Sequence, residues 1–148
     1  MRFGIVMGAL ALAGASSVLA QDEAVAPAAD ANLFVYRDYA EPTAWAPTLK
    51  IDGRKLVAIG QNQYTAVHLA PGEYEIQLSW PFLSGQSGKK GSIRIVEGET
   101  LYLEVVGTSQ YAGGGPGYME FLIGSGLTPR EDASDAIASC CRFKPPKL

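Results

Sequence analysis

At 148 residues the chain has room for one domain with a hydrophobic core, and this length requires neither a metal ion nor a disulfide framework. It carries 12 Lys and Arg against 15 Asp and Glu, scattered along the sequence. A weakly acidic chain without a basic stripe is unsuited to binding nucleic acid and to electrostatic docking on anionic lipid.

The first 20 residues have the pattern of a secretory signal peptide. Arg2 precedes an apolar stretch that runs from Phe3 to about Ala13, and small residues follow up to Ala20. That stretch is short for a membrane span, which needs about 20 apolar residues, so an uncleaved anchor is the weaker alternative. We expect cleavage near Ala20 and a soluble periplasmic or secreted protein without a transmembrane segment. Loss of Arg2 leaves a net charge of −4.

Residues 21–31 are rich in alanine and acidic residues, which is typical of a flexible linker. From residue 32 the chain alternates apolar and polar residues in short stretches, as strands with one buried face do. "NLFVYR" and "TLKI" come first, the dipeptide Asp52-Gly53 supplies a tight turn, and "RKLVAI" and "QYTAVHL" follow.

The stretch "EYEIQLSW" at 73–80 is the clearest strand. A turn at Pro71-Gly72 precedes it, and its apolar residues alternate with polar ones. "SIRIV", "ETLYLEVV" and, after the glycine-rich loop "GTSQYAGGGPGY", "MEFLI" complete the series. Seven or eight antiparallel strands over 32–126 predict an all-β sandwich. A single small barrel is the structural alternative.

Residues 127–148 predict a short C-terminal helix and a tail. The residues from Thr128 to Glu131 match a capping box with proline at the first helical position, and "REDASDAIASCC" would form about three helical turns. Cys140 and Cys141 are the redox candidates. Their options are two thiols, a strained vicinal bridge or a bond to another chain, and we expect one half-buried and one exposed thiol because adjacent helical side chains diverge.

No recognisable catalytic or metal-binding motif occurs. His68 is the only histidine, and metal sites and nucleophile–base pairs need several partners. The chain is therefore predicted to be neither an enzyme nor a metal or cofactor binder. Aromatic residues near strand ends are the binding candidates, either stacking on sugars or capping the core: Trp45, Trp80, Tyr111 and Tyr118.

The pattern resembles the bacterial domain-of-unknown-function family 2846 over residues 32–106. The matching positions are Tyr36-Arg37, Asp52-Gly53, Pro71-Gly72, Tyr74, Gly98 and Tyr102. It is also similar to PEGA domains and to carboxypeptidase-regulatory-like sandwiches. The resemblance implies a small secreted or lipid-anchored β-sandwich and no catalytic residues. This chain lacks the lipidation cysteine of the anchored members.

We therefore expect an exported, non-enzymatic interaction or accessory module of the bacterial cell envelope. Its contact surfaces would be the loop-end aromatics and an exposed strand edge, and its partner an envelope protein or cell-wall material. The alternative is a small-ligand or glycan-binding domain that uses the same aromatics.

Overall fold

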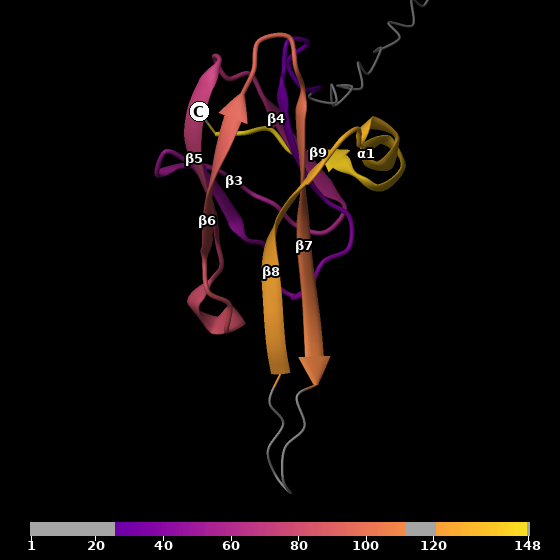
Figure 1. Cartoon of the computed structure of the whole chain (residues 1–148). Coiled ribbons are helices and arrows are strands. Elements are labelled where there is room, and N and C mark those ends of the chain that lie inside the picture. The colour runs from indigo at the N-terminus through magenta and orange to yellow at the C-terminus, as the bar shows by residue number, and fades with distance from the viewer. Residues whose placement is uncertain (1–25, 112–120, 148) are drawn as a thin grey trace, which may run out of the picture.

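The computed structural model describes residues 26–111 and 121–147 and places nine strands in two packed sheets (Figure 1). The five-stranded sheet has the order β8-β7-β1-β4-β9, and the four-stranded sheet has the order β3-β2-β5-β6. The strands are β1 Leu33–Arg37, β2 Thr48–Ile51, β3 Arg54–Ala58, β4 Gln63–Val67, β5 Gly72–Ser79, β6 Lys89–Ile95, β7 Leu101–Tyr111, β8 Phe121–Arg130 and β9 Arg142–Phe143. The helical elements are the 3₁₀ turn η1 Phe82–Ser84 and the helix α1 Ser134–Cys140. The predicted all-β sandwich with one short C-terminal helix is confirmed.

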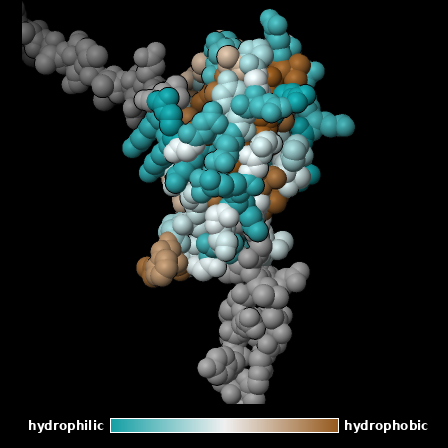
Figure 2. Space-filling model, turned by 60° about the vertical axis from the view of Figure 1, so that its left-hand side comes forward, coloured by the Kyte–Doolittle hydropathy of each residue, from teal (hydrophilic) through white to brown (hydrophobic). Residues whose placement is uncertain are grey.

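The core lies between the two sheets, where the alternating apolar residues predicted for each strand meet. In β5 the side chains of Ile76 and Leu78 are buried, whereas Glu73 and Glu75 point to solvent and pair with Arg94 and Lys90 of β6. The hydrophilic side chains at the front of Figure 2 cover this outer face. One face of the sheet therefore packs on the core and the other faces water, because successive side chains of a strand point to opposite faces.

The hairpin between β2 and β3 is built as its sequence predicts. Asp52 and Gly53 have φ values of 48° and 75°, the left-handed conformation that a two-residue hairpin turn needs. The turn is also tied to the neighbouring strand, because Asp52 Oδ1 accepts a 2.8 Å hydrogen bond from the backbone N–H of Glu75.

Two strand pairings differ from the antiparallel arrangement that was predicted. β1 pairs with β7 in parallel, and β4 pairs with β9 in parallel. The reason is the path of the chain, since it passes through the β5–β6 hairpin of the other sheet before β7 returns beside β1. Such crossovers depend on long-range packing and leave no local sequence signal.

The predicted boundary at residue 126 and the capping box after it are wrong. β8 continues through Thr128 to Arg130, and it is paired with β7 along its whole length. The backbone pairing of all ten β8 residues with β7 is more favourable than the short helix that the capping box would start. Pro129 is tolerated because β8 is an edge strand. The sandwich also includes the C-terminal segment, since Lys147 N–H donates a 2.8 Å hydrogen bond to Leu56 O of β3.

Helix α1 begins later than predicted, at Ser134, and Asp132 stabilises its start. The carboxylate accepts bonds from the backbone N–H of Ser134 at 2.9 Å and from its hydroxyl at 2.8 Å. These two hydrogen bonds, the backbone one first, lower the pKa of Asp132.

Asp132→Ala should lower the urea midpoint of unfolding at neutral pH. Because the folded-state pKa is depressed, the contribution is present above the ordinary pKa of about 4 and is lost as pH falls through the folded value. The difference between wild type and variant should therefore shrink in acid. Asp132→Asn keeps an oxygen acceptor but does not titrate, and serves as the control. A difference that is constant from neutral pH to acid would contradict this role.

Candidate functional site

Three loops meet at one end of the sandwich, residues 38–47, 59–62 and 80–88, and we call this surface the loop end. In Figure 1 it is the end that carries the pink turn η1, and β7 and β8 continue past it. Arg37, the last residue of β1, is completely buried beneath it and contacts all three loops. Its guanidinium therefore joins segments that are far apart in the sequence.

The contacts of Arg37 are mainly to backbone carbonyls. Nη1 donates to Trp45 O at 2.8 Å and to Ile59 O at 3.2 Å, and Nη2 donates to Ala40 O at 2.8 Å and to Pro42 O at 2.7 Å. Charge-assisted bonds of this kind are stronger than neutral ones. Three of these bonds hold the 38–47 loop in a single path across the end of the core, and the fourth joins that loop to the 59–62 loop.

The electrostatics of Arg37 follow from its burial. Desolvation lowers the pKa of its guanidinium, and the nearby charge of Glu41 acts in the opposite direction. The guanidinium carbon also lies 5.2 Å from the ring centroid of Trp80, within the range of a cation–π contact. Sequence reasoning missed Arg37 as a structural centre because an arginine at the end of a strand normally reaches solvent.

The loop end exposes large apolar side chains. Among the described residues, five large hydrophobic side chains are exposed, and four of them lie on these loops: Tyr39 at 72%, Trp45 at 37%, Phe82 at 97% and Leu83 at 79%. The fifth, Val96, follows β6 at the opposite end. Isolated exposed hydrophobic residues are common, but a group gathered at one end indicates a contact surface.

The η1 turn holds Phe82 and Leu83 outward. Ser84 is buried, its N–H and hydroxyl bond to Pro81 O at 2.9 and 2.7 Å, and its Oγ accepts the N–H of Gln86 at 3.2 Å. Gly85 closes the turn with a φ of 67°. Figure 2 shows an apolar projection at this end of the molecule.

The four predicted binding aromatics have different positions. Trp80 is half-buried and packs on the core beside Arg37, as a core cap does, whereas Trp45 is exposed on the loop end. Tyr111 ends β7, and Tyr118 lies outside the described residues. The structure thus brings Trp45 and Trp80 to the same end, linked through Arg37.

A second apolar surface lies on the outer face of the five-stranded sheet. Aromatic rings from four adjacent strands form a row, with centroid separations of 5.3 Å for Tyr102–Phe34, 6.5 Å for Phe34–Tyr64 and 5.3 Å for Tyr64–Phe143. Helix α1 packs on this row through the buried Ile137, and a groove of about 270 Å³ lies where the two meet. Its lining side chains are uncharged, so the groove suits a neutral ligand rather than an ion.

Cys140 and Cys141 form a disulfide, so the expected pair of thiols is wrong. The prediction assumed a continuous helix, in which adjacent side chains diverge. The helix ends at Cys140, and Cys141 is extended with φ −128° and ψ 140°, which brings the two sulfurs together. Cys141 lines the groove beside α1.

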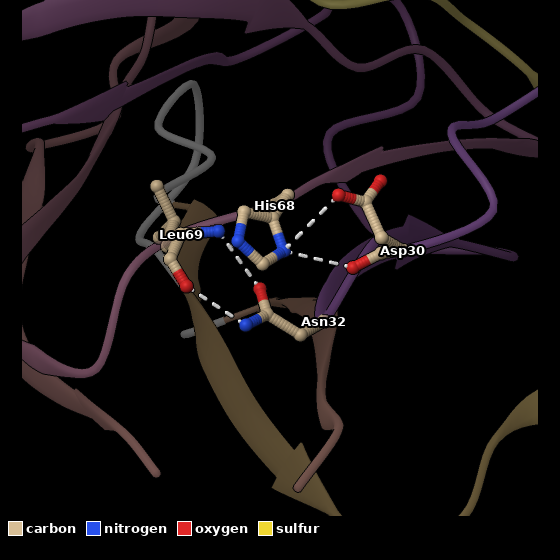
Figure 3. Close-up of polar contacts among 4 residues, drawn as sticks. All are labelled: Asp30, Asn32, His68 and Leu69. Carbon is tan, nitrogen blue, oxygen red and sulfur yellow. Dashed lines mark hydrogen bonds and ion pairs between the residues drawn. The ribbon is translucent and has the colours of Figure 1, made fainter. Parts of the chain in front are cut away.

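His68 joins the segment before β1 to the residues after β4 (Figure 3). Its Nδ1 lies 2.9 Å from the carbonyl oxygen of Asp30 and 3.6 Å from Oδ2 of the same residue. Beside it, the Asn32 amide bonds both to the N–H of Leu69 at 2.9 Å and to its carbonyl at 2.8 Å. These contacts extend the β1–β4 pairing, which gives the histidine a structural role.

Within residues 26–111 and 121–147, no group of three or more His, Cys, Asp or Glu side chains is placed to hold a metal ion. In the same residues, no helix is long and apolar enough to cross a membrane. Comparison of the chain with protein-family models, curated proteins and solved structures found no match. The resemblance to family 2846 stays a prediction.

Proposed function

We propose that this protein is an exported, non-enzymatic interaction module of the bacterial cell envelope, and that the loop end is its contact surface. The observation that carries the proposal is the clustering of Tyr39, Trp45, Phe82 and Leu83 at one end of the molecule. The Cys140–Cys141 bond supports the exported location, because disulfides persist in oxidising compartments. The signal-peptide pattern of residues 1–20 supports it independently.

Rigid presentation of the loops favours binding to a partner. A surface held in its bound conformation loses less conformational freedom on association than a flexible loop does. Arg37 fixes the 38–47 loop through three carbonyls, and Ser84 fixes the η1 turn. The apolar side chains therefore stand on a scaffold that is already ordered.

The test compares the capture of envelope components by wild type, by the double variant Phe82→Ser, Leu83→Ser and by Val96→Ser. Purified protein is crosslinked to envelope fractions, and the captured material is identified by mass spectrometry. The double variant should lose capture by about tenfold or more, since each buried apolar side chain contributes about 1.5–3 kcal/mol. Both variants should keep the stability of wild type within about 0.5 kcal/mol, because the changed side chains are exposed.

Val96→Ser is the matched control, because it removes an exposed apolar side chain at the opposite end. Equal capture by all three proteins would refute the loop end as the contact surface. Failure of wild type to capture anything above an unrelated sandwich would favour the alternative function, a small-ligand or glycan-binding domain that uses the loop-end aromatics.

A further inference from the structure

A cavity lies at the end of the sandwich opposite the loop end, between β3 of one sheet and β4 of the other. Its volume of about 490 Å³ is within the size range of small-ligand sites. Apolar side chains of the core form most of its lining. They are Ile51, Leu56 and Val67, which are buried, and Leu69 and Tyr74, which are half-buried.

The C-terminal tail reaches the rim of this cavity. After β9 the tail crosses from the five-stranded sheet to the four-stranded sheet, and Figure 1 shows it in yellow. Lys144 N–H donates a 2.7 Å hydrogen bond to Tyr64 O of β4, and Lys147 N–H donates one of 2.8 Å to Leu56 O of β3. The backbone therefore fixes Lys147 at the cavity, while its side chain is exposed.

The rim is positively charged, although the whole chain is acidic. Arg54 lies opposite the buried Ile51 in the β2–β3 pair, and directly opposite residues share a face of the sheet, so Arg54 is on the cavity side. Lys55 follows on the outer face, and Lys147 comes from the tail. These three cations line the cavity together with one carboxylate, that of Asp52, which gives a net charge of +2.

The three cations have no hydrogen-bond or ion-pair partner within residues 26–111 and 121–147, whereas Lys90, Arg94 and Arg130 are paired with glutamates. Asp52 is engaged elsewhere, because its Oδ1 accepts the N–H of Glu75. Unpaired cations above an apolar cavity are complementary to a ligand with an anionic head and an apolar body.

We propose that this cavity binds a small amphiphilic anion, a carboxylate with an aliphatic chain. The chain lies against Leu56, Val67 and Leu69, and the head group lies beside Arg54 and Lys147. Burial of the chain supplies most of the affinity, and the cations select the sign of the head group. The inference goes beyond the proposed function, because it concerns the opposite end of the molecule and does not depend on the loop end.

The test is titration of the exported, processed protein with octanoate, 1-octanol and octylammonium, followed by NMR of the methyl groups. Octanoate should shift the methyl signals of Leu56, Val67 and Leu69, and leave those of Ile93 on the distant strand β6 unchanged. It should bind at least about threefold more tightly than octanol, and octylammonium should bind most weakly. Ionic strength of about 1 M, where the screening length is about 3 Å, should remove the difference between octanoate and octanol.

Arg54→Gln combined with Lys147→Gln should weaken octanoate binding by about three- to tenfold and leave octanol binding unchanged. The substitution at Lys147 keeps the backbone bond to Leu56 O. Lys90→Gln combined with Arg94→Gln is the matched control, because it removes the same charges from the outer face of β6 and should bind as wild type does. Equal urea midpoints will establish that all three proteins are folded.

Four results would overturn the inference. They are no shift of the cavity methyl signals with octanoate, equal affinity for octanoate and octanol at low salt, equal weakening in the two double variants, and binding that appears only after Leu148 is removed. The last result would mean that the chain's own C-terminus, rather than a ligand, is the occupant. Envelope capture through Phe82 and Leu83 is measured separately, so its success or failure does not change this outcome.

Discussion

The Arg37→Met variant is expected to lose about 3–5 kcal/mol of unfolding free energy. Methionine keeps much of the apolar stem but donates no hydrogen bond, so the carbonyls of Pro42, Trp45 and Ile59 lose the Arg37 donor. Ala40 O retains one donor, the side-chain amide of Gln61. Each buried carbonyl left without a donor costs about 1–3 kcal/mol.

Urea unfolding followed by circular dichroism measures the loss, and Arg94→Met is the matched control. Arg94 pairs with Glu73 on an exposed face, and surface pairs contribute about 0–1 kcal/mol. A loss at Arg37 no larger than that at Arg94 would contradict the role of Arg37 as the centre of the loop end.

Gly107→Ala is expected to lower the unfolding free energy by about 1–3 kcal/mol or more. A Cβ atom at Gly107 would lie 1.9 Å from the carbonyl oxygen of Glu41, and backbone cannot rotate away as a side chain does. The two segments are also joined, because Glu41 N–H donates a 3.2 Å hydrogen bond to Gly107 O. The substitution should push the 38–47 loop off β7 and speed amide exchange at Glu41.

Gly126→Ala in β8 provides the control. Gly126 lies opposite Val106, and a Cβ atom there would meet no heavy atom within 4 Å. Its effect should stay within about 0.5 kcal/mol. Equal effects of the two substitutions would show that the close approach at Gly107 does not constrain the loop.

The local features of the fold were predictable because their causes are local. The alternation of apolar and polar residues in β5 buries Ile76 and Leu78. Asp52-Gly53 supplies the positive φ values that the β2–β3 hairpin needs. Nearest-neighbour chemistry is sufficient for such elements.

The features that position the candidate site depend on distant residues. In the sequence, Arg37 is only a polar residue at the end of a strand, and its burial depends on three loops from distant parts of the chain. The aromatic row likewise depends on the strand order β7-β1-β4-β9, which places its four rings side by side. The sequence did contain one signal for that row, which is an aromatic residue in each of the four strands: Phe34, Tyr64, Tyr102 and Phe143. Chain crossovers decide which of these residues meet, and sequence periodicity does not encode them.

The most direct test of the loop end as the contact surface is photo-crosslinking in intact cells. Benzoylphenylalanine at position 82 replaces one exposed aromatic residue with another, and the same group at position 96 reports on the opposite end. We predict crosslinked products from position 82 and none from position 96. Products from position 96 alone, or equal products from both positions, would contradict the assignment.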